Sequence, residues 1–157
     1  MCIRDSGHRL LAENAVSALT ESIFPIACII TPNISEAEIL SDMEIKNPDQ
    51  MVKSAEVISE KFGGNVLIKG GHLENTAADL LYADGVNTWF ETKKIDNPNT
   101  HGTGCTLSSA IASNLAKGMD VKESVKLAKD YVTGAIMDGL DLGRGRGPLN
   151  HMYKNII

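Results

Sequence analysis

The sequence predicts an α/β fold with a mostly parallel central sheet. Two short apolar runs, at residues 27–31 (ACIIT) and 65–69 (NVLIK), have the length and composition of buried parallel strands. Segments with apolar residues at helical spacing precede and follow these runs, and strands that alternate with helices are typical of layered folds with a parallel sheet. Ligands of such folds bind beyond the carboxyl ends of the strands, so the loops there are the first candidates for a site.

Three segments of the first half of the chain have the spacing and end signals of helices: 12–24, 35–40 and 48–62. Pro25 ends the first of them. Ser35 and Glu38 form the pattern of a capping box at the start of the second. Pro48 stands at the first helical position of the third, and Gly63 ends it.

The second half of the chain predicts a pair of antiparallel strands and two helices. The strands are expected at residues 79–82 and 88–91. Asp84 and Gly85 between them are typical of a hairpin turn. A helix is expected over 103–118, where apolar residues recur every four positions. Asp120 is the expected cap of the last helix, with Glu123 three residues further on.

Composition describes an ordinary soluble domain and excludes some functions. The chain has 157 residues, 43% of them hydrophobic, and a net charge of −5. Without a basic run, a nucleic-acid partner is not expected, and without a long apolar run neither is a membrane span or signal peptide. Cys2, Cys28 and Cys105 have no metal-type spacing, which favours a reducing cytoplasm. We expect Cys28 to lie in the core.

The segment 102–105 (GTGC) directly precedes a helical pattern. Glycine lets the backbone approach a ligand closely, and the free N–H groups of a helix start favour an anion such as phosphate. A thiol at Cys105 would be activated there and could accept a proton from an alcohol. Each feature also has a simpler explanation: an ordinary loop-to-helix turn, and a small buried hydrophobic residue.

Polar residues follow both predicted parallel strands. Lys69 ends the second strand and could reach a bound phosphate, although an exposed lysine at a strand end is common. Asn33 and Glu36 follow the first strand and suit Mg²⁺, mostly through water. Glu36 could equally be an acidic residue of a helix first turn. His72 and His101 lack a second ligand at metal spacing, so no histidine metal site is expected.

Three motifs together resemble a known family: TPNISEAEIL (31–40), VLIKGGHL (66–73) and THGTGCTLSSAIA (100–112). The family is the hydroxymethylpyrimidine/phosphomethylpyrimidine kinases of thiamine biosynthesis, within the ribokinase-like superfamily. The ending GPLNHMYK is also similar. The resemblance implies a ribokinase-like three-layer sandwich, of which residues 6–157 are the C-terminal portion and the N-terminal part is missing. Residues 1–5 are expected to be a non-native or disordered leader.

The same resemblance implies site roles, position by position. Gly102 and Gly104 match the anion hole that stabilises the transferring phosphoryl group, and Cys105 takes the place of the catalytic base. Glu36 would hold Mg²⁺. Contacts to ATP are implied for four residues: Asn33, Lys69, Thr100 and Thr103.

The activity that the resemblance implies has two steps. ATP would phosphorylate 4-amino-5-hydroxymethyl-2-methylpyrimidine to its monophosphate and then to its diphosphate, in a cytoplasmic enzyme that is a homodimer at full length. Two other possibilities stay open. The chain resembles, less closely, the pyridoxal or hydroxyethylthiazole kinases of the same superfamily, or it is an inactive fragment that binds nucleotide.

Overall fold

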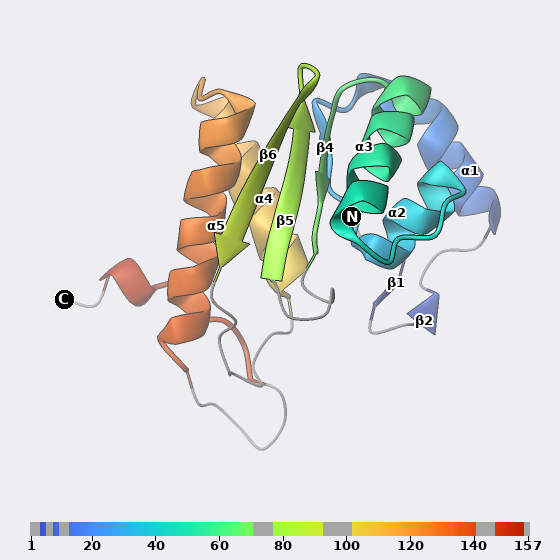
Figure 1. Ribbon diagram of the computed structural model, residues 1–157. Helices are drawn as coiled ribbons and strands as arrows, with labels where there is room; N and C mark the ends of the chain where they lie inside the picture. The colour runs from blue at the N-terminus through green and yellow to red at the C-terminus, as the bar shows by residue number, and fades with distance from the viewer. Residues whose placement is uncertain are drawn as a thin grey trace. The chain divides into compact units, whose positions relative to one another are not determined.

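The computed structural model has the expected α/β architecture and divides into two compact units (Figure 1). It describes residues 4–5, 8–9, 13–70, 77–92, 102–140 and 147–155. The first unit spans Met1–Lys93 and the second Lys94–Ile157, and each is described by itself below. Four residues singled out in the sequence lie outside the described residues: Cys2, His72, Thr100 and His101.

The first unit is built on a four-stranded sheet. Its strands are β3 (Ile29–Ile30), β4 (Asn65–Ile68), β5 (Ala77–Ala83) and β6 (Val86–Thr92), in the order β3-β4-β5-β6. Strands β3 and β4 are parallel, as predicted, and β5 and β6 form the predicted hairpin. Since β4 and β5 are also antiparallel, the described sheet is less parallel than expected. Helices connect β3 to β4, whereas a short link and a two-residue turn reverse the chain afterwards.

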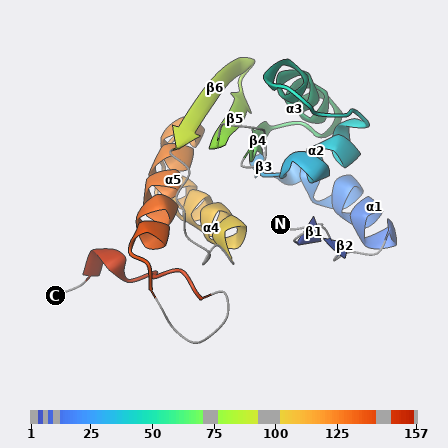
Figure 2. The same ribbon diagram turned by 60° about the horizontal axis from the view of Figure 1, so that its bottom comes forward.

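The helices of the first unit follow the predicted pattern. They are α1 (Glu13–Ser22), α2 (Ile34–Ser41) and α3 (Pro48–Phe62). A short 3₁₀ helix, Phe24–Ile26, contains the predicted breaker Pro25. Helices α2 and α3 pack against each other, and α3 lies along β4 and β5 (Figure 2). Their apolar faces share one core with the sheet, which includes Leu40, Met51, Ile58, Val66 and Leu80.

One element of the first unit has no counterpart in the sequence patterns. Strands β1 (Arg4–Asp5) and β2 (His8–Arg9) pair as a short antiparallel ribbon. Only two residues of each strand are paired, too few for alternation to show in the sequence.

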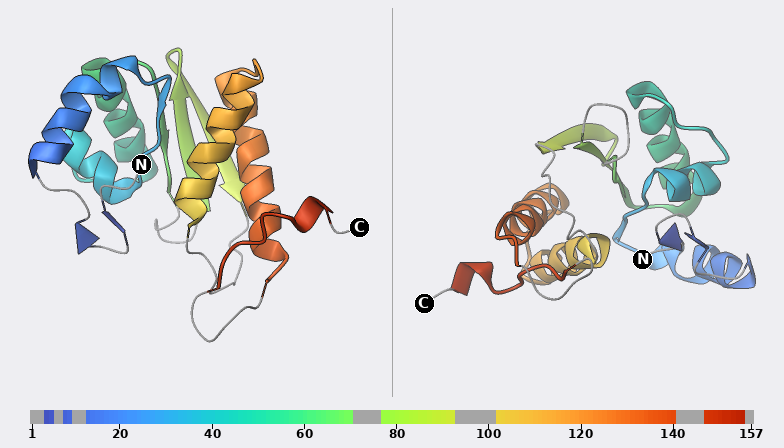
Figure 3. Two further views of the ribbon diagram at one scale, coloured as in Figure 1. Left: turned by 180° about the vertical axis from the view of Figure 1, so that it is seen from behind. Right: turned by 90° about the horizontal axis from the view of Figure 1, so that it is seen from below.

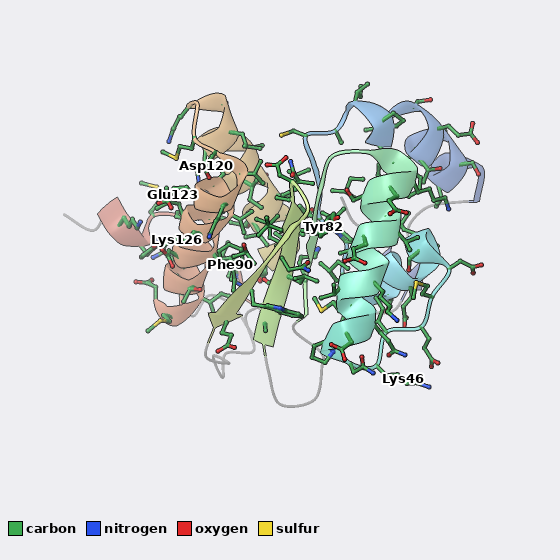
Figure 4. All side chains as sticks on the ribbon, turned by 45° about the horizontal axis from the view of Figure 1, so that its top comes forward. Lys46, Tyr82, Phe90, Asp120, Glu123 and Lys126 are labelled. Carbon is green, nitrogen blue, oxygen red and sulfur yellow. The ribbon has the colours of Figure 1, made fainter. Side chains whose placement is uncertain are left out.

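The second unit contains α4 (Thr103–Ala116) and α5 (Val121–Met137), which pack side by side (Figure 3). Gly118 ends the α4 segment at a positive φ of 84°. The Asp120 side chain accepts the Glu123 N–H at 2.8 Å and so caps α5 as predicted. Figure 4 shows both residues, with Lys126, on the first turns of α5. The buried residues of this pair are Leu107, Ile111, Val125, Ala128 and Val132, with Ser124 and Ala135.

The C-terminal segment returns to α5. The Asn150 amide donates to Asp138 at 2.6 Å, and the Tyr131 hydroxyl donates to the His151 carbonyl at 3.0 Å. The Tyr153 ring of a 3₁₀ helix, Tyr153–Asn155, lies directly over Gly134, where a Cβ would overlap it. Among the described helices, none combines the length and the apolar character needed to cross a membrane.

Candidate functional site

Asn33 and Glu36 form the capping box at the start of α2. The Asn33 Oδ1 accepts the Glu36 N–H at 2.8 Å, and a Glu36 carboxylate oxygen accepts the Asn33 N–H at 2.9 Å. The predicted box of Ser35 and Glu38 is therefore wrong by two positions. Asn33 has extended backbone after Pro32, as an N-cap requires, and α2 starts at the next residue.

The ends of the parallel strands β3 and β4 place three of the expected site residues together. Asn33 and Lys69 form an isolated parallel bridge, and the Lys69 N–H donates to the Pro32 carbonyl at 2.9 Å. Glu36 is buried at 1% exposure, while Asn33 and Lys69 are half-buried. Asn33, Glu36 and Lys69 therefore lie together beyond the carboxyl ends of β3 and β4, where ligands of such folds bind.

Asp79 of β5 also reaches this edge, and the sequence patterns gave it no role. Its Oδ1 accepts the buried Gly70 N–H at 2.9 Å, one residue after Lys69. Gly70 has no room for a side chain, since a Cβ there would overlap the carbonyl oxygen of Ala78 and lie 3.2 Å from the Met51 Cε. An acidic residue inside a run of apolar strand residues is the signal that could have revealed Asp79.

The start of α4 is open to an anion. Its N-cap is Gly102, with φ 81°. Glycine has no side chain that could accept the N–H groups of the first turn. The first turn also contains no acidic residue. Helices α2, α3 and α5 differ, since each has a side-chain cap and an acidic residue in its first turn. Within the part of the chain that the structure describes, the positive end of α4 thus has no side-chain cap and no acidic first-turn residue to compensate it.

Cys105 is exposed in the first turn of α4. It lies at one wall of a cavity of about 840 Å³ in the second unit, which is also lined by Ser109, Ser113, His151 and Lys154. The thiol is therefore accessible, and the alternative of a buried hydrophobic residue is excluded.

Cys28 is also exposed, contrary to the expectation that it lies in the core. It directly precedes β3, an edge strand with one neighbour among the described strands. A residue at the edge of a sheet has a neighbouring strand on one side only. The apolar run around Cys28 predicts a strand but not its place at the edge.

The donor set for a cation in the first unit is small. Among the described residues, no three His, Cys, Asp or Glu side chains cluster as a metal site would require. Two described carboxylates lie at the strand ends: Asp79, which accepts the Gly70 N–H, and Glu36, which has the Asn33 amide beside it. One carboxylate fits Mg²⁺, which is commonly held by one or two carboxylates together with phosphates and water. The observed side chains therefore suit Mg²⁺ only when a phosphorylated ligand supplies further oxygen atoms to the cation.

Comparison with known proteins gives a consistent result. Residues 1–150 match the family model described as phosphomethylpyrimidine kinase. A hydroxymethylpyrimidine/phosphomethylpyrimidine kinase of Haemophilus influenzae is 41% identical over 154 residues, which cover 95% of this chain. The chain spans 57% of the length of that relative.

Solved structures of related kinases share the fold. A Bacillus subtilis pyridoxal kinase, solved as an ADP complex, is 38% identical with a TM-score of 0.84, over 94% of this chain and 58% of its own. A phosphomethylpyrimidine kinase of Clostridium difficile is 40% identical with a TM-score of 0.73, over 85% of this chain and 53% of its own. Both likenesses place the chain among ribokinase-like kinases.

Proposed function

The chain belongs to the phosphomethylpyrimidine kinase family, and we propose that it serves in the transfer of phosphate from ATP to 4-amino-5-hydroxymethyl-2-methylpyrimidine and to its monophosphate. The observation that carries the proposal is the start of α4, where an exposed cysteine follows an N-cap glycine with positive φ. A helix start with neither side-chain cap nor acidic residue suits a phosphoryl group, and the accessible thiol suits an alcohol beside it.

Each group has a distinct part in the proposed reaction. Phosphoryl transfer depends mainly on positioning and on stabilising the negative charge of the transferring group. The backbone from Gly102 to Gly104 would stabilise that charge, and Lys69 would hold a nucleotide phosphate. Glu36, with Asn33, would hold Mg²⁺ through water, and the cation neutralises phosphate charge when bound.

The two acceptors place different demands on Cys105. The first acceptor is an alcohol, so its proton must leave as the new bond to phosphorus forms, and the thiolate would take it. The second acceptor is a phosphate that is already ionised and has no such proton to lose. Cys105 is therefore proposed as the base of the first step alone.

Titration of the chain with AMP-PCP, a non-hydrolysable ATP analogue, tests the nucleotide part of this proposal. We expect saturable binding that strengthens when Mg²⁺ is added, because Glu36 and Asn33 would hold the cation and its charge would favour the phosphates. Absence of binding at millimolar AMP-PCP, with and without Mg²⁺, would contradict the proposal.

Replacing Asn33 separates its capping role from its proposed nucleotide contact. Asn33→Ala removes the α2 cap, so we expect a loss of about 1 kcal/mol in the free energy of unfolding and weaker AMP-PCP binding. Asn47→Ala is the matched control, because Asn47 caps α3 in the same way, accepting the Gln50 N–H at 2.9 Å. It should cost similar stability and leave binding unchanged. Equal binding by both variants would limit Asn33 to capping.

A second candidate function is phosphorylation of pyridoxal, and the likeness to pyridoxal kinase structures specifically favours it. A third is nucleotide binding without turnover, since the chain spans little more than half of its relatives. A panel of acceptors separates the three. The homodimer and the cytoplasmic setting implied by the resemblance belong to the same proposal.

A further inference from the structure

Lys69 is anchored on both sides by backbone hydrogen bonds. Its own N–H donates to the Pro32 carbonyl at 2.9 Å, at the end of β3. The N–H of the next residue, Gly70, donates to the Asp79 carboxylate at 2.9 Å, in β5. The segment that directly follows β4 is thus held from both sides, once by the Pro32 backbone after β3 and once by the Asp79 side chain of β5.

Asp79 is an unusual residue for its place in the sheet. It lies within β5 at 9% exposure, beside the fully buried Leu80, and it pairs with Phe90 of β6. Burial of a carboxylate is unfavourable unless hydrogen bonds compensate for the lost water. The Asp79 carboxylate therefore needs hydrogen bonds at this buried position, and the one from the Gly70 N–H is among them.

The backbone around Gly70 leaves that contact little freedom. A side chain at Gly70 would overlap the Ala78 carbonyl, so the chain passes directly against β5. Asp79 accepts the Gly70 N–H at this crossing, where no strand ladder supplies a backbone acceptor for it. A buried N–H without an acceptor is unfavourable, so removal of the Asp79 oxygen would favour movement of the segment that carries Lys69.

We propose that Asp79 is a positioning residue: it fixes Gly70, and through it the backbone of Lys69, so that the lysine amine is held ready for a nucleotide phosphate. The inference rests on the proposed function of Lys69. A side chain that is already ordered loses less conformational freedom when its ligand binds, which strengthens binding.

A simple effect of charge predicts the opposite result. Asp79 contacts Gly70, the residue next to Lys69, and its negative charge would repel a phosphate bound by that lysine. On this reasoning, removal of the Asp79 charge would strengthen nucleotide binding. Asp79→Asn removes the charge but retains an acceptor oxygen, whereas Asp79→Ala removes both. Comparison of the two variants therefore separates positioning from charge.

The experiment is AMP-PCP titration of the wild-type chain, Asp79→Asn and Asp79→Ala, together with hydrogen exchange of the Gly70 amide without ligand. We expect Asp79→Ala to weaken binding by about 3- to 10-fold and to speed Gly70 exchange, and Asp79→Asn to stay within about 2-fold of wild type. In a Lys69→Ala background, Asp79→Ala should cause no further loss, because it acts through the lysine. Asp84→Asn, on the exposed turn of the same hairpin, is the control and should change nothing.

Three results would overturn the inference: AMP-PCP binding by Asp79→Ala as tight as wild type or tighter, an equal further loss in the Lys69→Ala background, or Gly70 exchange that is no faster in Asp79→Ala. Loss by Asp79→Asn equal to that of Asp79→Ala would also overturn it. Failure of the wild-type chain to bind AMP-PCP would overturn the proposed function and, with it, this role. The two failures are distinguishable, because the first four results leave wild-type binding intact.

Discussion

Cys105→Ala is expected to slow phosphorylation of the pyrimidine alcohol by about 100-fold or more, while phosphorylation of the monophosphate changes little. Loss of general-base catalysis has an effect of this size, and only the alcohol has a proton to give. Cys105 is exposed in the first turn of α4, so its removal leaves no cavity in a core. AMP-PCP binding should therefore be unchanged.

Separate rate measurements for the two acceptors check this result. They are made on this chain and on a chimera that joins it to the part of the Haemophilus influenzae relative that it does not match. Cys28→Ala is the matched control, since it removes the other described exposed thiol, in the first unit, and should alter neither rate. An equal loss in both steps after Cys105→Ala would rule out the base and assign Cys105 to binding or structure.

Gly70→Ala is expected to destabilise the first unit by about 3 kcal/mol or more. The added Cβ would overlap the Ala78 carbonyl and press on Met51, and the carbonyl belongs to the paired strand β5, which cannot move aside alone. A shift of this backbone would also separate Gly70 from Asp79. Chemical denaturation followed by circular dichroism measures the loss.

Gly85→Ala is the control for Gly70→Ala. Gly85 has φ 75° in the hairpin turn but open space around its Cβ position, so the substitution should cost only about 1–2 kcal/mol of backbone strain. A smaller loss for Gly70→Ala than for Gly85→Ala would show that the crossing next to β5 is looser than the structure indicates.

Local signals in the sequence were sufficient for most helices and for the hairpin. Pro48 after Asn47, Asp120 with Glu123, and the Asp84-Gly85 turn each act within a few residues of chain, and the structure confirms all three. The start of α2 shows the limit of such signals. Two overlapping patterns, one from Asn33 and one from Ser35, both fit a capping box.

Contacts between distant segments decided the features that the sequence left open. The extended conformation of Asn33 accompanies its bridge to Lys69, which directly follows β4 much later in the chain. Asp79 meets Gly70 only because β5 turns back along β4. Neither partnership has a repeating pattern that a single sequence displays. The glycines and the cysteine at 102–105 were identified from the sequence, but only the structure shows that the Cys105 thiol is exposed.

The most direct test is ATP-dependent phosphorylation of the pyrimidine alcohol, its monophosphate and pyridoxal, assayed in parallel with this chain and with the chimera. The proposed function predicts phosphate transfer to both pyrimidine acceptors and slower transfer to pyridoxal. Transfer to pyridoxal with neither pyrimidine phosphorylated would contradict it and favour the pyridoxal kinase alternative.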